Sequence, residues 1–278
     1  MTRTWFITGA ARGIGAAIAR AAIGVGDTVV ATARDPAKVT QAIEAPADRL
    51  LALPLDVTNA VQVQAMVEAA IGQFGRIDVL VNNAGYGQLG IFEENEPGDA
   101  ERQFATNVFG LFNVTRAVLP TMRRQRAGHI FNLSSIAGMR GGPGGGIYCS
   151  SKHAVEGLSE SLSHEVASFG IHVTLVEPGF FRTDFLDDSS VRFGANPIAD
   201  YAELSATLRS GYAARNHQQA GDPAKLAAAI VDLAGREKPP LRFAAGSDAV
   251  AIIGAKIDSL KAELEAWRDL SVSTDGAF

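Results

Sequence analysis

The feature that most constrains the fold is a regular alternation of short apolar runs with longer helical patterns along the chain. The short runs are rich in β-branched residues and predict strands at 4–8, 28–33, 50–54, 78–82, 129–134, 172–177 and 241–244. Helical periodicity fills the intervals, at about 13–25, 59–74, 99–125, 147–169, 223–235 and 247–268. This alternation predicts an α/β fold, a doubly wound parallel sheet of about seven strands with helices on both faces.

A single domain, residues 1–278, is the simplest organisation, because no linker, low-complexity tract or fixed-period repeat interrupts the pattern. The least regular region is 184–222, which is polar and contains Pro197. A long irregular stretch in a compact domain is usually a lid or a binding loop. We therefore expect 184–222 to bind the substrate. The alternative is a mobile surface loop without function.

Composition argues against several classes of protein. The net charge of −5 disfavours a nucleic-acid partner, which would need clustered Lys and Arg. The single cysteine, Cys149, excludes an internal disulfide. No apolar run reaches 18 residues, so no membrane span is expected, and the chain opens on a strand rather than a signal peptide. We expect a cytoplasmic protein. The five histidines lack a metal-ligand spacing, so no metal site is expected.

A glycine cluster follows the first predicted strand, in the segment from Thr8 to Gly15. Gly9, Gly13 and Gly15 allow a tight bend from strand to helix and let backbone N–H groups approach a pyrophosphate. The spacing is G-x-x-x-G-x-G rather than G-x-G-x-x-G. The position after the first strand favours a dinucleotide site and a Rossmann-like sheet over a purely structural turn.

The end of the second strand indicates which dinucleotide binds. An acidic residue about 20 positions past the glycine turn usually holds a free ribose 2′-hydroxyl. Here Ala33 occupies that place and Arg34 follows it. The Arg34 guanidinium can bind a 2′-phosphate, and Arg12 in the glycine turn could point at the same phosphate. We therefore expect NADP(H) rather than NAD(H). The alternative is that Arg34 only pairs with Asp35.

Tyr148 and Lys152 stand four residues apart in the predicted helix 147–169, so they share one face of it. A free tyrosine has a pKa of about 10, and a neighbouring cation lowers that pKa. Such a phenol could exchange a proton with a carbonyl or an alcohol. A surface pair is the alternative, since Tyr-x-x-x-Lys is common by chance.

Together these residues resemble the short-chain dehydrogenase/reductase family over roughly residues 4–185. The matching positions, in the family's order and spacing, are Thr8-Gly9-x-x-x-Gly13-x-Gly15, Asp56, Asn82-Asn83-Ala84-Gly85, Asn107, Ser135, Tyr148-x-x-x-Lys152, and Pro178-Gly179 with Thr183. One departure is the glycine-rich stretch 141–146 before the tyrosine, which leaves the pocket wall undefined.

The resemblance implies a role for each residue. Tyr148 would be the general acid/base, Lys152 would lower its pKa and hold the nicotinamide ribose, and Ser135 would bind the substrate oxygen. Asn107 would bridge through water to the lysine; a structural mid-helix Asn is the alternative. Ser134 is expected to face away from Ser135, because side chains alternate along a strand. The implied cofactor-binding residues are Gly9, Arg12, Gly13, Ile14, Gly15, Arg34, Asp56, Val57, Asn83, Ala84, Gly85, Tyr148, Lys152, Pro178, Gly179 and Thr183.

The expected function is an NADP(H)-dependent oxidoreductase that interconverts a secondary alcohol and a ketone or aldehyde by hydride transfer. Two alternatives stay open: a nucleotide-sugar epimerase or dehydratase, and a non-catalytic NADP(H)-sensing protein. The short tail disfavours the first, and the retained tyrosine and lysine disfavour the second. The substrate pocket is expected near 87–92, 141–147 and 184–222, with an apolar substrate favoured by Phe92, Phe180, Phe181, Phe185 and Tyr212.

The apolar faces of the predicted helices 99–125 and 147–169 exceed what one sheet face needs. By resemblance they would pair subunits, so we expect a homodimer or homotetramer. The C-terminal helix has apolar residues at Ile253, Ile257, Leu260 and Leu264. It is expected to pack on the sheet or near the pocket.

Overall fold

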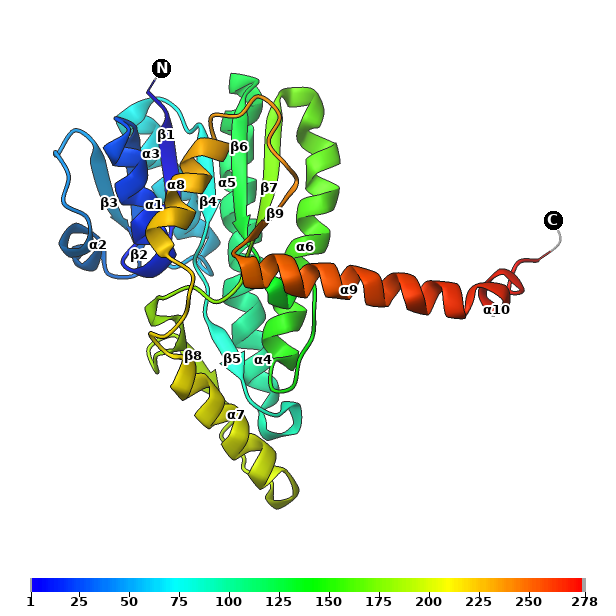
Figure 1. The fold of residues 1–278 in the computed structure, drawn as a ribbon. Helices are drawn as coiled ribbons and strands as arrows, with labels where there is room; N and C mark the ends of the chain where they lie inside the picture. The colour runs from blue at the N-terminus through cyan, green and yellow to red at the C-terminus, as the bar shows by residue number, and fades with distance from the viewer. Residues whose placement is uncertain (1, 277–278) are drawn as a thin grey trace.

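A computed structural model describes residues 2–276 and contains one seven-stranded sheet with the order β3-β2-β1-β4-β6-β7-β9. Every neighbouring pair in it is parallel (Figure 1). The strands are β1 (Thr4–Thr8), β2 (Thr28–Ala33), β3 (Leu50–Pro54), β4 (Val79–Asn82), β6 (Gly128–Leu133), β7 (Ile171–Pro178) and β9 (Arg242–Ala245). The predicted α/β fold is confirmed, and each predicted strand lies within one residue of its observed bounds.

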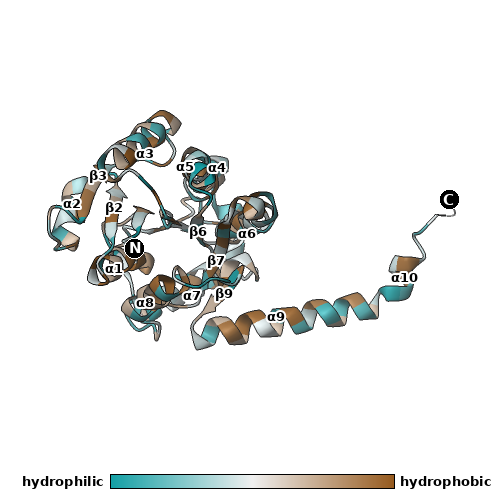
Figure 2. Ribbon diagram, turned by 90° about the horizontal axis from the view of Figure 1, so that it is seen from above, coloured by the Kyte–Doolittle hydropathy of each residue, from teal (hydrophilic) through white to brown (hydrophobic). Residues whose placement is uncertain are grey.

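Helices cover both faces of this sheet, as Figure 2 shows from above. One face packs against α1 (Gly13–Gly24), α2 (Pro36–Ala42) and α8 (Pro223–Leu233). The other packs against α3 (Ala60–Phe74), α5 (Leu111–Gln125) and α6 (Gly146–Val166). Because both faces are covered, the central strands are buried apolar runs, with Trp5, Phe6 and Ile7 of β1 fully buried, whereas the edge strands β3 and β9 are mostly half-buried.

Strand order reverses at β1, which lies between β2 and β4. In open α/β sheets, ligands bind at the carboxyl ends of the strands beside such a switch point. The turns that leave β1 and β4 carry the glycine cluster and Asn83, so the fold brings these two segments together.

Two helical regions differ from the sequence prediction. α2 was not predicted, although its start has an ordinary signal: Asp35 accepts a hydrogen bond from the Ala37 N–H and Pro36 follows as the first helical residue. The predicted helix 99–125 is divided into α4 (Pro97–Phe104), a π-helical turn (Ala105–Gly110) and α5. Such turns widen the helix locally and occur often at functional sites.

The 184–222 segment is more regular than its sequence suggested. It contains β8 (Val191–Phe193), which pairs in parallel with β5 (Gly87–Leu89), and the helix α7 (Ala202–Arg215). The prediction of an irregular loop was wrong because α7 buries none of its residues and therefore lacks an apolar stripe that periodicity could detect.

The C-terminal helix α9 (Ser247–Ala266) projects away from the sheet and is followed by α10 (Arg268–Val272), as Figures 1 and 2 show. Only Ala249 and Ile253 of α9 are buried. The expectation that this helix packs against the sheet or pocket therefore holds only for its first turns, where Ile252 lines the cavity described below. Among residues 2–276, no helix has the length and apolar character that crossing a bilayer requires.

Candidate active site

A cavity of about 1280 Å³ lies at the carboxyl ends of the strands, between the sheet and the 184–222 segment. It exceeds the roughly 300–1,000 Å³ of ordinary small-molecule pockets, so it has room for a dinucleotide and a second ligand. Gly15 and Asn107 do not line it. The predicted site residues that do are Gly9, Arg12, Gly13, Ile14, Arg34, Asp56, Val57, Asn83, Ala84, Gly85, Ser135, Tyr148, Lys152, Pro178, Gly179 and Thr183.

The glycine turn is built for close approach of a ligand to backbone. Gly9 and Gly13 have φ of +67° and +56°, and a Cβ on Gly9 would lie 2.9 Å from the Ala84 Cα. Asn83 Nδ2 holds the turn by donating to the carbonyls of Thr8 (2.9 Å) and Gly9 (3.0 Å). No side chain caps the N-terminus of α1, which leaves its N–H groups free for an anion. The residues present therefore fit a pyrophosphate.

Gly15 has a packing role rather than a cavity contact. A Cβ there would lie 2.5 Å from Asn83 Nδ2 and 2.6 Å from the Gly9 carbonyl oxygen. Asp56 likewise shapes a turn, since its Oδ1 accepts from the Thr58 N–H (2.9 Å) and hydroxyl (2.8 Å). Val57, which follows it, is buried but still lines the cavity.

One end of the cavity carries two exposed cations, Arg34 and Lys38, beside Ala33. The Asp35 carboxylate caps α2. Lys38 was not among the residues predicted from the sequence. Because α2 was not predicted either, nothing indicated that Lys38 lies about one helical turn after Arg34. Two such cations suit a phosphate monoester better than a neutral hydroxyl.

Arg12 does not point toward that end, contrary to expectation. Its guanidinium donates to the Ser189 hydroxyl (2.5 Å), the Ser189 carbonyl (3.1 Å) and the Ser190 hydroxyl (2.6 Å). The two serines belong to the 184–222 segment, so Arg12 ties this segment to the glycine turn. No spacing in the sequence relates residues 177 positions apart.

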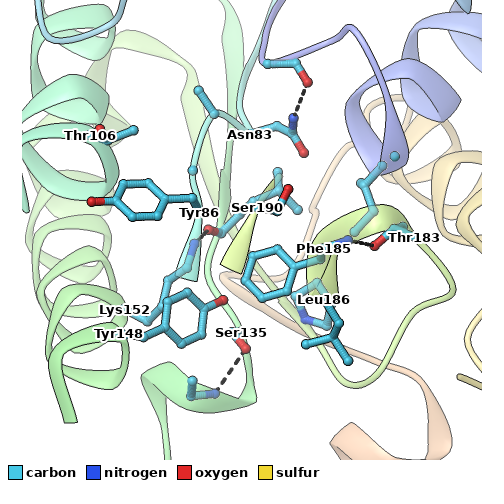
Figure 3. Close-up of a pocket in the computed structure, with 18 of the residues that line it drawn as sticks. Asn83, Tyr86, Thr106, Ser135, Tyr148, Lys152, Thr183, Phe185, Leu186 and Ser190 are labelled. Atoms are coloured by element: carbon cyan, nitrogen blue, oxygen red, sulfur yellow. Dashed lines mark hydrogen bonds between the residues drawn. The ribbon is translucent and has the colours of Figure 1, made fainter. Parts of the chain in front are cut away.

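Ser135, Tyr148 and Lys152 lie together on the opposite wall of the cavity (Figure 3). Ser135 is the N-cap of a short 3-10 turn and accepts the Ala137 N–H at 3.1 Å. Tyr148 and Lys152 share a face of α6, as their spacing predicted, with the Lys152 Nζ 5.8 Å from the Tyr148 ring centre. Lys152 Nζ donates to the Leu133 carbonyl at 2.6 Å. Ser134 is also among the lining residues, but its Oγ is fully buried and lies beside Gly138, so it faces away from the cavity as expected.

Burial is the largest influence on the pKa values of Tyr148 and Lys152 in this wall. It raises the pKa of Tyr148, while interaction with the Ser135 hydroxyl lowers it. Lysine responds in the opposite direction: burial lowers the pKa of Lys152 to about 8, partly offset by the Glu156 carboxylate. The expected lowering of the Tyr148 pKa by Lys152 is therefore not seen, because desolvation of the phenol is the largest effect on this pKa and only Ser135 opposes it.

Asn107 lies in the π-helical turn and is nearly fully buried. Its side chain accepts the Tyr86 N–H (3.2 Å), donates to the Tyr86 carbonyl (3.0 Å) and reaches the Ser151 hydroxyl (3.4 Å). These contacts fix the segment after β4 beside α6. They agree with the structural alternative for Asn107, and the water bridge to Lys152 stays a prediction.

Behind Lys152 lies a buried cluster of charges that the sequence did not reveal. The Arg242 guanidinium of β9 pairs with Glu156 of α6, with Glu177 of β7 at 3.3 Å and with the exposed Glu160 at 3.1 Å. Burial and the neighbouring Glu156 raise the pKa of Glu177 to about 7, although Arg242 opposes this. The cluster joins the helix that carries Tyr148 and Lys152 to the strand that ends at Pro178.

The remaining cavity wall comes from residues 180–222, where aromatic and apolar side chains alternate with polar ones. Phe180, Phe181, Phe185 and Tyr212 line it as expected, and the Phe185 ring centre lies 5.6 Å from that of Tyr148. Thr183, at the entry to this segment, accepts the Phe185 N–H at 3.3 Å. Phe92 was predicted here wrongly: it is 73% exposed and lies outside the cavity. Of residues 87–92, only Leu89 lines the cavity.

Asp184, Asp187 and His217 bring one possible ligand atom each within 4.8 Å of one another. Sequence spacing could not find this group, because the fold joins residues about thirty positions apart. Asp187 already accepts hydrogen bonds from Asn216 (2.5 Å) and His217 (3.1 Å), and the group is half-exposed or exposed. Protein contacts account for its arrangement.

Comparison with known proteins gives a consistent result at the level of family. The family model described as short chain dehydrogenase matches residues 3–191. Oxidoreductase BOA17 of Botryotinia fuckeliana is 41% identical over 277 residues, which cover 99% of this chain and 100% of that protein. A 3-ketodihydrosphingosine reductase of Bacteroides thetaiotaomicron is 40% identical over 241 residues, 86% of each chain.

Solved structures show the same architecture. A short-chain dehydrogenase from Streptomyces avermitilis superimposes with a TM-score of 0.92 at 41% identity, covering 99% of this chain and 100% of that chain. A Burkholderia phymatum relative in complex with NAD has a TM-score of 0.78 at 26% identity, covering 100% and 98%. ElxO with NADP bound has a TM-score of 0.72 at 29% identity, covering 87% and 96%.

Proposed function

This chain belongs to the short-chain dehydrogenase family, and from that premise we propose that it is an NADP(H)-dependent oxidoreductase. It interconverts a secondary alcohol and a ketone or aldehyde, with Tyr148 as general acid/base. The observation that carries the proposal is one cavity with an anion-binding glycine turn at its side and Ser135, Tyr148 and Lys152 on its wall. The oxidoreductase relatives and the nicotinamide-bound structures of the family support it.

The chain's residues divide the work of the reaction. A bound nicotinamide would supply or accept the hydride. Ser135 would donate a hydrogen bond to the substrate carbonyl oxygen, and Tyr148 would give that oxygen its proton as the alcohol forms. Because burial raises the pKa of Tyr148, the phenol is protonated at neutral pH and is ready to act as an acid in reduction. The Lys152 ammonium would then stabilise the phenolate that is left.

The cations at the far end support NADP(H) rather than NAD(H). Arg34 and Lys38 line the cavity with no acidic residue at position 33. Among the structures compared, one holds NAD and another NADP, so the family alone does not choose between them. Arg34 and Lys38 are therefore the residues that favour NADP(H) over NAD(H) in this chain.

The substrate we propose is an apolar ketone or its alcohol. Leu89, Phe181, Phe185 and Leu186 provide an apolar wall across from Tyr148. One relative is named as a 3-ketodihydrosphingosine reductase, so at least one similar protein is named for the reduction of a ketone.

The test is the loss of NADPH absorbance with a panel of ketones and aldehydes of increasing chain length. Tyr148→Phe should lower turnover by roughly 10²- to 10⁴-fold, the usual contribution of general acid–base catalysis, while the NADPH dissociation constant stays within about threefold. Tyr201→Phe is the matched control, because Tyr201 lies outside the cavity at the start of α7, and it should keep normal turnover. Normal turnover in Tyr148→Phe would contradict the mechanism.

Two other outcomes would favour the alternatives. NADPH binding with no turnover on any carbonyl would indicate a cofactor-sensing protein. Conversion of a nucleotide sugar without net change in NADPH would indicate an epimerase or dehydratase.

A further inference from the structure

The arm, defined as residues 254–272, is the part of the molecule that its own fold does not explain. It comprises the outer part of α9 and α10, and Figure 1 shows it extending from the body. Within the described chain, its side-chain hydrogen bonds and ion pair are all local, such as that between Arg268 and Glu265. An isolated helix of this length is marginal in water, so we expect a partner surface to support it.

The arm carries an apolar stripe with a regular spacing. Starting at Val250 on the base of the helix, apolar residues follow at intervals of three and four. Such a 3-4 repeat is the pattern of a coiled-coil seam. All but one of these side chains are between 48% and 64% exposed; the exception is Ile253, which the body covers. The full stripe is Val250, Ile253, Ile257, Leu260, Leu264 and Trp267.

The charges on the arm favour a second copy of the same arm as its partner. Its inner half carries Lys256, Asp258 and Lys261, a net charge of +1. Its outer half carries Glu263, Glu265, Arg268 and Asp269, a net charge of −2. In an antiparallel pair of arms, a lysine of the inner half and a glutamate of the outer half can therefore face each other twice, once on each side of a twofold axis. The arm as a whole is slightly acidic, which does not suit an anionic membrane surface.

We propose that the arm is an interaction surface for a second copy of this chain, and that two arms pair as an antiparallel coiled coil. Full overlap would place Trp267 of one copy against Val250 of the other, and Ile257 against Leu260. Val250 is 61% exposed at the base of α9, and this overlap covers it. The inference does not depend on the proposed activity.

Flanking charges distinguish this register from its competitors. In the proposed register, Lys256 of each copy faces Glu263 of the other, which gives two opposite-charge pairs. A parallel pairing would set Lys256 against Lys261. An antiparallel pairing shifted outward by one heptad would set Glu263 against Glu263 and Lys261 against Lys261. Only the full-overlap register avoids a contact between like charges.

The first experiment uses cysteines to test the register. Lys256→Cys and Glu263→Cys proteins, distinguished by a tag, are mixed and mildly oxidised. A disulfide between the two variants is expected in the mixture, whereas each variant alone should give none, because the two copies lie about 8 Å apart along the axis at position 256 and about 14 Å apart at position 263. The controls are Ala255→Cys with Ala262→Cys, on the opposite face, and the unmodified chain, whose only thiol is Cys149. A mixture with no more cross-linked dimer than its parts would overturn the register.

The second experiment tests the partner itself by measuring mass in solution by sedimentation. Ile257→Asp combined with Leu260→Asp should halve the mass of the assembly, since both charges fall in the seam. Ala255→Asp combined with Ala262→Asp adds the same charge on the opposite face and should leave the mass unchanged. A monomeric wild-type chain at tens of micromolar, or a seam variant with wild-type mass, would overturn the proposal.

Discussion

Lys152 is buried and Tyr148 is half-buried, and desolvation shifts their pKa values in opposite directions. The sequence indicated their adjacency, because residues four apart share a helical face. It did not indicate the electrostatic outcome, which depends on how much water the surrounding elements exclude. Ser135 contributes from a different element, and only the fold brings its hydroxyl to the phenol.

Arg34 and Lys38 are the single residues expected to distinguish NADPH from NADH. Replacing both with Ala should weaken NADPH binding by roughly ten- to a hundredfold, because two charge-assisted contacts to a phosphate are lost. NADH binding should change little, as it lacks that phosphate. Titration of each variant with both cofactors checks this. Equal losses for NADPH and NADH would mean that the two side chains do not contact a 2′-phosphate.

At the scale of elements, the charged cluster around Arg242 joins α6, β7 and β9. Glu156 and Glu177 are almost fully buried and share one guanidinium, so the site holds more negative than positive charge when both are ionised. A raised pKa at Glu177 is the physical result: the carboxyl keeps a proton near neutral pH. The positions of α6, β7 and β9 therefore depend on a group that titrates near neutral pH.

The pH dependence of stability follows from that shift. The folded pKa of Glu177, about 7, lies above its ordinary value of 4.5, so its contribution is complete below pH 4.5 and is lost as pH rises through 7. Glu177→Gln mimics the protonated form and should gain roughly 1 to 3 kcal/mol relative to wild type between pH 5 and pH 8. Denaturant unfolding at both pH values checks this. Glu160→Gln, an exposed partner of the same arginine, should show a smaller change, and a flat difference for Glu177→Gln would contradict the prediction.

At the scale of the whole molecule, the cofactor cavity joins most of the sheet's carboxyl edge to the 184–222 segment. Binding there should stabilise the entire fold, by about 2.7 kcal/mol at a hundredfold excess of NADPH over its dissociation constant. Gly9→Ala should abolish this gain, because its Cβ would meet the Ala84 Cα at 2.9 Å in a backbone of positive φ.

Gly72→Ala is the matched control for that experiment. Gly72 lies in α3, where a methyl group on its Cα would have no atom within 4 Å and the backbone φ is ordinary for a helix. This variant should keep the full rise in melting temperature with NADPH. If Gly9→Ala keeps it as well, the glycine turn does not hold the pyrophosphate.

Assembly is the other property of the whole molecule. The sequence predicted pairing of subunits through the helices around 99–125 and 147–169, and this stays a prediction. The projecting arm adds a second candidate surface, separate in space from those helices (Figure 2). A homotetramer would follow if both surfaces are used.

The sequence by itself determined the sheet, the glycine turn and most of the predicted residues that line the cavity, because these depend on local rules: apolar periodicity, glycine at strand ends and the four-residue spacing of a helical face. The tertiary structure decided the rest. Arg12 bonds to serines far along the chain, Arg242 joins three elements, Phe92 lies outside the cavity, and α7 shows no periodicity because it buries nothing. Each of these depends on which distant segments share space, and no local pattern in a sequence records that.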